Sequence, residues 1–344
     1  MRLKTKPSTA KCNEHMYSAY LMSAQTKTSC VRLSEIMYGV SHDSINRFLE
    51  RERFTPLDLF NENRFHLVLS GGVLSVDDSV LDKQFSNPEH APLIDYYWSG
   101  KHHKAIKGLN LVTLFYTDTN GLSMPVNYRI CNKSSAKTKN DLFREMLDEV
   151  LAWGLRPAIV TGDSWYSSLG NLKHIRKCGL DFLFGVSLDR QISIIKGSYI
   201  RVDQLVDLPD AGQIVYLKEF GSIRVFRQNF KEEYRYYIMG VAKLENLDKL
   251  NCQMFEHYHA MHWNIENYHR AIKQVCNIEK FQVRKSHAIR NHVYCSLRAF
   301  CKLELMKSKQ IISNLYQLQR ELFNKLIAQF IQTNGVAGIA TAYF

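Results

Sequence analysis

The pattern of apolar and polar residues predicts a mixed α/β core between residues 66 and 190. Short apolar runs typical of strands occupy this region, and two amphipathic helical patterns separate the later runs. Asn120-Gly121 joins two of the runs and is a strong hairpin signal. We expect strands at 66–70, 73–76, 109–117, 122–130, 157–161 and 180–186, and helices at 137–152 and 169–178.

This order of elements predicts an α/β fold around a mixed sheet, and it is the order of ribonuclease-H-like cores. Between residues 191 and 240 the pattern changes to short runs separated by Gly, Pro and Asn, which predicts an antiparallel β insertion. Arginine and aromatic residues alternate in these runs. That mixture suits either a strand with one wet face or stacking on unpaired bases.

The N-terminal region is predicted to be small and helical. A helical pattern over 29–37 ends near Gly39, and Ser41 is a good N-cap for a second helix over 42–50. Two short helices joined by such a turn form a candidate helix-turn-helix. The second helix carries residue types that reach base edges and phosphates, so we expect DNA binding. The alternative is a helical hairpin without that role.

From residue 251 the chain is predicted to be helical to near residue 332, with apolar residues at helical spacing. The changes of pattern divide the chain into five segments. These are a helical DNA-binding region (1–65), the first part of the core (66–190), the β insertion (191–240), the second part of the core (241–285) and a C-terminal helical region (286–344).

Charge and cysteine content narrow the choice of partners and compartment. Lys and Arg outnumber Asp and Glu by 45 to 33, for a net charge of +12, which favours a polyanion such as nucleic acid. The eight cysteines show no C-x-x-C pair and suggest reduced thiols. The N-terminus is polar, and no apolar run approaches the ~18 residues of a membrane span. We expect a cytoplasmic protein without a membrane partner.

Three acidic residues are candidates for chemistry. Asp77 and Asp163 each follow a short apolar run, and open α/β sheets place their ligands at such strand ends. Glu266 lies on a predicted helix among several potential cations. Three carboxylates suit phosphodiester chemistry, because two Mg²⁺ ions about 3.5–4 Å apart serve the attacking and leaving oxygens. Asp78 and Asp82 are rival ligands, but Asp78 would point to the opposite side of its strand.

The segments around these acids resemble the DDE insertion-sequence transposases, in the branch with a β insertion before the catalytic Glu. The resemblance covers roughly residues 25 to 300, and its last segment is the most specific. The matching segments are Val76-Asp77-Asp78-Ser79, Val160-Thr161-Gly162-Asp163-Ser164-Trp165-Tyr166 and Trp263-Asn264-Ile265-Glu266-Asn267-Tyr268-His269-Arg270-Ala271-Ile272-Lys273.

The resemblance implies a Mg²⁺-dependent transposase, an endonuclease and strand transferase, in which Mn²⁺ is able to substitute. It implies Asp77, Asp163 and Glu266 as the catalytic metal ligands. It also implies a prokaryotic, nucleoid-associated protein that binds double-stranded DNA, both terminal inverted repeats and target, as a homodimer. The residues expected to contact phosphates or DNA are Lys273, His262 and Arg270, with Arg47 and Asn46 on the N-terminal helix. Tyr216, Phe220 and Phe226 are candidates for stacking on a flipped base, although core packing is the commoner role.

The chain departs from the family signature of Tyr, two residues, Arg, three residues, Glu, six residues and Lys. Glu266 and Lys273 fit, whereas His259 and His262 occupy the Tyr and Arg positions. Two alternatives therefore stay open: a catalytically inactive, transposase-derived DNA-binding protein, and a nuclease without strand transfer. A zinc site is a weaker alternative, with His257, His259, His262 and His269 as ligands. A Cys–His nucleophile pair has no local signature.

Overall fold

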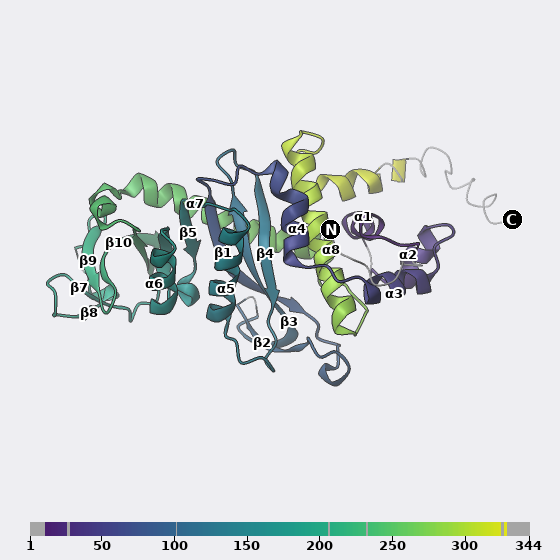
Figure 1. Cartoon of the computed structure of the whole chain (residues 1–344), viewed down its shortest axis with the longest axis horizontal. Coiled ribbons are helices and arrows are strands. Elements are labelled where there is room, and N and C mark those ends of the chain that lie inside the picture. Colours follow the sequence, from purple (N-terminus) through teal and green to yellow (C-terminus); the bar gives the residue numbers. More distant parts are fainter. Residues whose placement is uncertain are drawn as a thin grey trace. The chain divides into compact units, whose positions relative to one another are not determined.

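A computed structural model describes residues 11–25, 28–100, 102–205, 207–231, 233–324 and 327–328. Contacts divide the chain into two compact units (Figure 1). Unit 1 comprises residues 1–55, 81–94 and 268–344, and unit 2 comprises residues 56–80 and 95–267. In the described part of the chain, no helix has both the length and the apolarity needed to cross a membrane.

Unit 2 is built on the predicted α/β core. Its first strands are β1 (Val73–Asp82), β2 (Asp95–Ser99), β3 (Lys104–Thr117), β4 (Ser123–Ile130), β5 (Ile159–Gly162) and β6 (Asp181–Val186). β3 lies between β4 and β1, while β1, β5 and β6 pair in parallel. The order β4-β3-β1-β5-β6 with an antiparallel β3–β4 hairpin is that of a ribonuclease-H-like core, so the predicted fold class is confirmed.

The β insertion is confirmed as antiparallel strands, and it continues the core sheet. Its strands are β7 (Gln191–Ser193), β8 (Ile200–Arg201), β9 (Gln213–Leu217), β10 (Gly221–Phe230) and β11 (Glu233–Gly240). β11 pairs with β10 on one side and with β6 on the other. The insertion therefore extends the core by direct hydrogen bonding, which makes one 11-stranded sheet.

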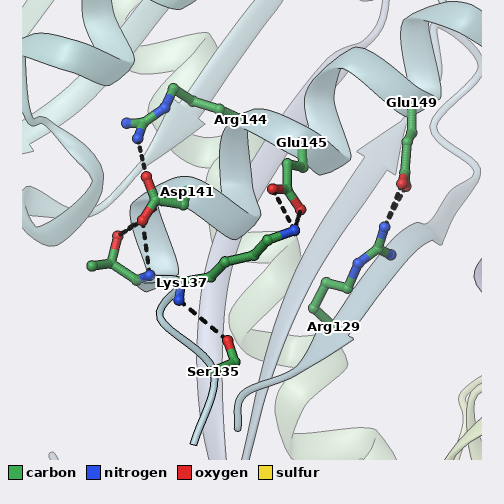
Figure 2. A network of polar contacts seen from close by, with 8 residues as sticks. Arg129, Ser135, Lys137, Asp141, Arg144, Glu145 and Glu149 are labelled. Carbon is green, nitrogen blue, oxygen red and sulfur yellow. Dashed lines mark hydrogen bonds and ion pairs between the residues drawn. The ribbon is translucent and has the colours of Figure 1, made fainter. Parts of the chain in front are cut away.

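Helices cover this sheet. They are α4 (Pro56–Asn63), α5 (Lys139–Ala152), α6 (Leu169–Lys177) and α7 (Cys252–Gln274), the last of which runs into unit 1. α5 begins with a capping box between Thr138 and Asp141 and buries Phe143, Met146, Leu147 and Val150. Its opposite side is polar, with ion pairs to neighbouring residues (Figure 2). Short 3-10 turns occur at Arg64–His66, Pro88–His90, Ser164–Tyr166, Val202–Gln204 and Leu244–Lys249.

The start of α7 packs on the insertion and the core together. Phe255 stacks on Phe226 of β10, with ring centroids 4.8 Å apart and an interplanar angle of 4°. Val73, Ile159 and other buried residues of the sheet belong to the same apolar cluster. Phe226 is therefore a core residue, and Phe220 packs against Phe182 at 5.5 Å. Core packing thus accounts for Phe226, whereas Phe220 is half-buried.

The prediction of a strand over 66–70 is wrong. Residues 64–66 form a 3-10 turn, and only Ser70 makes an isolated bridge, with Arg156. Side chains replace the missing strand partner, because the Val68 N–H donates to Asp118 and the Val68 carbonyl accepts from the Tyr116 hydroxyl. The short strand β2, most of whose residues lie near the surface, was not expected.

The described part of unit 1 is mostly helical. Its helices are α1 (Glu14–Ser23), α2 (Cys30–Ile36), α3 (His42–Arg51) and α8 (Ser286–Ser308). The predicted helical pair is confirmed: Gly39 takes a left-handed φ of +77° between α2 and α3, and the Ser41 side chain caps α3. α1 and α3 both pack on α8. Residues 317–324 are also helical.

Candidate active site

Two of the predicted acids follow neighbouring strands in register. The parallel pairing of β1 and β5 ends at Val76 opposite Gly162, and Asp77 and Asp163 come directly afterwards. Asp163 keeps an extended backbone (φ −77°, ψ −179°), so the two residues remain adjacent beyond the pairing. β1 itself continues to Asp82, which means that Asp77 marks the end of pairing with β5 and not the end of the strand.

Both acids face helix α7. Side chains alternate along a strand, so Val73, Ser75 and Asp77 share one face. Val73 packs in the cluster around Phe255 of α7, and Ser75 Oγ lies 2.9 Å from Thr161 Oγ1 on β5. Thr161 is two residues before Asp163 and contacts α7 directly. The alternation therefore directs Asp77 and Asp163 toward α7.

Glu266 on α7 completes the group. His262 Nδ1 lies 3.1 Å from Thr161 Oγ1, and Glu266 follows one helical turn later on the same side. A carboxylate oxygen of Glu266 lies within 4.8 Å of one of Asp77. Ile265 is fully buried, and Asn264 reaches Thr117 Oγ1 at 3.4 Å, so α7 is fixed on both sides of this turn. The structure therefore brings Asp77 close to Glu266, and Asp163 lies near enough to Asp77 for the Asp77 charge to add to the raised pKa of Asp163.

Asp163 is electrostatically unusual. Burial of the carboxyl group, together with the charges of Asp77 and Asp78, raises the pKa of Asp163 from its ordinary 3.8 to about 7. The residue as a whole is nevertheless exposed to solvent. Such a carboxyl binds a proton or a cation readily, because either one relieves the repulsion.

Gly162 sets the position of Asp163. A Cβ atom at Gly162 would lie 2.5 Å from the Phe184 ring and 2.9 Å from a Val76 methyl group. β5 therefore passes between β1 and β6 where only glycine fits, immediately before the acid. This explains the glycine of the Thr-Gly-Asp sequence in terms of packing rather than backbone flexibility.

Asp78, the rival ligand, points to the opposite face. Its carboxylate accepts from Lys139 at 2.6 Å, Asn110 at 2.6 Å and the Tyr166 hydroxyl at 3.0 Å. Burial and the nearby acids raise the pKa of Tyr166, so its hydroxyl stays a donor. Asp78 thus has structural partners beneath the site, which favours Asp77 as the ligand.

The two histidines at the Tyr and Arg positions of the signature contact the sheet. His259 Nε2 lies 3.1 Å from the Tyr237 hydroxyl, and burial lowers the pKa of His259, with a further decrease from Arg235. A neutral His259 has no positive charge with which to bind a phosphate. His262 contacts Thr161 as described above. Because these two histidines have separate partners on the sheet, they give no support to the histidine-only zinc alternative.

The remaining predicted residues lie outside this group. Lys273, on the last turn of α7, pairs with Glu279 at 3.5 Å, and both belong to unit 1. Arg270 is exposed on α7. Asn46 and Arg47 are half-buried on α3. Their assignment to phosphate or DNA remains a prediction.

One cluster of arginine and aromatic side chains in the insertion could not be placed from the sequence. At the end of the β10–β11 hairpin the Arg235 guanidinium lies 3.6 Å from the centroid of the Phe230 ring, and that of Arg227 lies 4.4 Å from that of Tyr234. Both rings are about half exposed. The alternation of arginine and aromatic residues was the available signal, but the pairing register was needed to place these residues together.

The donor set suits a hard cation. Asp77, Asp163 and Glu266 offer carboxylate oxygens, which are the ligands that Mg²⁺ and Mn²⁺ prefer. Burial and the neighbouring acids both raise the pKa of Asp163, and a bound cation would offset both effects. These residues therefore fit a divalent metal site.

Comparison with known proteins identifies the family. No curated protein matches the chain. Among solved structures, it is similar to piggyBac transposase in a synaptic complex with hairpin DNA (14% identity, 95% of this chain, 74% of that chain, TM-score 0.48). It is also similar to the Drosophila P element transposase strand transfer complex (9% identity, 96% of this chain, 88% of that chain, TM-score 0.18). Both likenesses are weak. Residues 71–301 match the model of the family described as "Transposase DDE domain".

That match spans well over half of the chain and includes all three carboxylates, so the protein belongs to the transposase DDE-domain family.

Proposed function

We propose that the protein cuts and joins the ends of an insertion sequence by metal-dependent phosphoryl transfer, with Asp77, Asp163 and Glu266 as metal ligands. The observation that supports this most strongly is the closeness of these carboxylates, since Asp77 and Glu266 oxygens lie within 4.8 Å and the Asp77 charge adds to burial in raising the pKa of Asp163. Family membership supplies the reaction class.

The chain's own residues have distinct roles in this proposal. Bound Mg²⁺ would activate the attacking oxygen and stabilise the leaving oxygen. Asp163 would exchange its proton for the cation, because a positive charge lowers the pKa of a carboxyl. Gly162 and the Ser75–Thr161–His262 contacts hold the strands and α7 at fixed spacing. Asp78 and Lys139 support the site from the other face of the sheet.

DNA would be held by the basic surface of the chain. The net charge of +12 favours contacts with phosphates. In this proposal Lys273, Arg270 and His262 contact phosphates near the reacting ends, and α3 recognises the terminal inverted repeats. Two ends must be brought together, so we propose a homodimer in the DNA complex. Light scattering of the protein with end DNA would measure that assembly, and a monomeric complex that still joins both ends would contradict it.

The test uses Asp163→Asn. A supercoiled plasmid carrying the DNA that flanks the coding region is incubated with the protein and Mg²⁺ or Mn²⁺. We expect wild type to cleave at the ends and to yield joined products. Asp163→Asn should lose cleavage by at least about 10³-fold while still shifting end DNA in a gel. The matched control is Asp95→Asn, which removes an acid paired with Lys133 on the surface. Cleavage by Asp163→Asn at the wild-type rate would overturn the assignment.

A measurement of the free energy of unfolding shows whether Asp163→Asn still folds. The pKa of Asp163 is about 7 in the folded chain against an ordinary 3.8, so the folded state holds an extra proton between these values. Without metal, this residue's contribution to stability therefore falls as pH rises from about 4 to about 7. At pH 8 in a chelator, Asp163→Asn should be more stable than wild type by about 1 kcal/mol, well below the full shift because the side chain reaches solvent.

A second candidate function is end binding without catalysis. The observation that favours it is that His259 and His262, at the Tyr and Arg positions of the family signature, make hydrogen-bond contacts with the sheet. It predicts gel shifts with wild type and no nicking in either metal. Nicked DNA without joined products would instead indicate the nuclease alternative.

A further inference from the structure

A histidine, a cysteine and an aspartate converge between α5 and α6, separate from the three carboxylates of the active site. His174 Nε2 lies 2.8 Å from Asp148 Oδ1, and Cys178 Sγ lies 3.8 Å from the same oxygen. One ligand atom of each residue lies within 4.8 Å of the other two. We propose that these three residues bind Zn²⁺ or a similar transition-metal ion.

The surroundings of Asp148 set it apart from the other acids of α5. Figure 2 shows that Asp141 pairs with Arg144, Glu145 with Lys137 and Glu149 with Arg129. Each of these acids therefore has a Lys or Arg partner. Asp148 instead faces an imidazole and a thiol, which are metal-ligand groups. An ordinary surface ion pair would not need the thiol.

The spacing suits a tetrahedral ion. Zinc bonds of about 2.0–2.3 Å to O, N and S place tetrahedral ligands about 3.3–3.7 Å apart. The observed 2.8 and 3.8 Å need changes of only about half an ångström. His174 and Cys178 are four residues apart at the end of α6, so one face presents both. Cys178 is the C-cap of α6, where the negative end of the helix dipole favours a cation.

The ligand chemistry selects the metal. Thiolate and imidazole favour Zn²⁺ or Co²⁺ over Mg²⁺, whereas the all-carboxylate active site has the opposite preference. The Asp148 side chain is 58% exposed and that of His174 22%, so water can complete the coordination. The ion would link α5 to α6, and α6 begins a few residues after Asp163. We therefore expect a structural role, with the metal stabilising the folded chain.

Cobalt is a direct probe, because only a thiolate ligand gives a strong sulfur-to-Co²⁺ charge-transfer band. The full-length protein is titrated with Co²⁺ in excess Mg²⁺, which occupies carboxylate-only sites. We expect the band to saturate at one equivalent and to disappear when Zn²⁺ is added. Cys178→Ser should abolish it, and His174→Gln should weaken Co²⁺ binding at least about tenfold.

Two controls make the outcome decisive. Cys252→Ser should leave the band unchanged, since Cys252 also lies near a carboxylate, Glu256 at 3.5 Å, but belongs to no three-ligand group in the described residues. Asp163→Asn should leave it unchanged too. Zn²⁺ should raise the Tm of wild type by about 2–4 °C and not that of Cys178→Ser. No band in wild type, or the same band in Cys178→Ser, would overturn the proposal and leave a His174–Asp148 ion pair.

Discussion

Gly162 shows how a single residue can control an active site without touching a substrate. It is the last residue of β5, it is buried between Val76 and Phe184, and Asp163 follows it directly. Any side chain at this position must push apart the parallel strands that align Asp77 with Asp163. The acids would then move relative to each other, and divalent-metal geometry tolerates little movement.

We predict that Gly162→Ala destabilises the protein by about 1–3 kcal/mol, as overpacking of a core does. It should also lower Mg²⁺-dependent cleavage by more than the loss of folded protein explains. Chemical unfolding and single-turnover cleavage measure the two effects. Gly100→Ala is the control, because a Cβ at Gly100 meets nothing within 4 Å. Unchanged cleavage by folded Gly162→Ala would show that the strand spacing is not critical.

At the residue scale the sequence identifies candidate residues but does not predict which of them are in contact. Asp77 and Asp163 could be proposed because each follows an apolar run, and alternation alone favoured Asp77 over Asp78. The contact between Thr161 and His262, 101 residues apart, depends on how α7 lies across the sheet. The Asp148–His174–Cys178 group likewise needs two helices packed side by side. Nothing in local spacing reveals either contact.

Helix α7 connects the insertion to the active site. Its first turns pack Phe255 on Phe226 of the insertion, and Glu266 lies three turns later on the same rigid element. Movement of the insertion would therefore shift the carboxylate. A 23-residue helix transmits such a shift better than a loop would, since its backbone hydrogen bonds resist bending.

We predict that Phe226→Ala destabilises unit 2 by about 3–5 kcal/mol, because it removes a buried ring from a stacked pair. Residual folded protein should cleave more slowly, since α7 loses its support. Phe230→Ala, at the exposed end of the same strand, should change stability by less than about 0.5 kcal/mol. Urea unfolding of both variants measures the difference, and equal losses would contradict the packing argument.

Elements with strong local signals were predicted well. The Asn-Gly hairpin, the capped helix α5 and the four-residue buried strand β5 all occur where expected. Residues 66–70 failed because their apolar pattern suits a strand, yet side chains of Tyr116 and Asp118 satisfy the backbone of Val68. These side-chain partners are far from Val68 in the sequence, so the local pattern could not predict them.

At the scale of the whole molecule, the two units differ in what acid does to them. In unit 1, His292 on α8 is fully buried, with Nδ1 2.9 Å from the Tyr17 hydroxyl and Nε2 3.2 Å from the Asn277 carbonyl. Burial, with a smaller contribution from the Lys83 charge, lowers the pKa of His292 from its ordinary 6.5 to about 3. The folded state therefore needs the neutral ring.

The lowered pKa of His292 in the folded chain sets the direction in which pH changes the stability of unit 1. Between about pH 6.5 and 3 the unfolded chain binds a proton at His292 that the folded chain does not. This contribution to stability is complete above pH 6.5 and is lost as pH falls. By pH 5 unit 1 should have lost about 2 kcal/mol from this residue.

Tryptophan makes the prediction measurable, because Trp98, Trp153, Trp165 and Trp263 all lie in unit 2. On acid titration, helical circular dichroism should fall before tryptophan fluorescence changes, since unit 1 loses its helices first. His292→Gln keeps a donor and an acceptor without a titrating ring, so its helical signal should persist to lower pH than in wild type. The exposed His287→Gln should behave as wild type does. If fluorescence and circular dichroism changed together in all three proteins, acid sensitivity would not reside in unit 1.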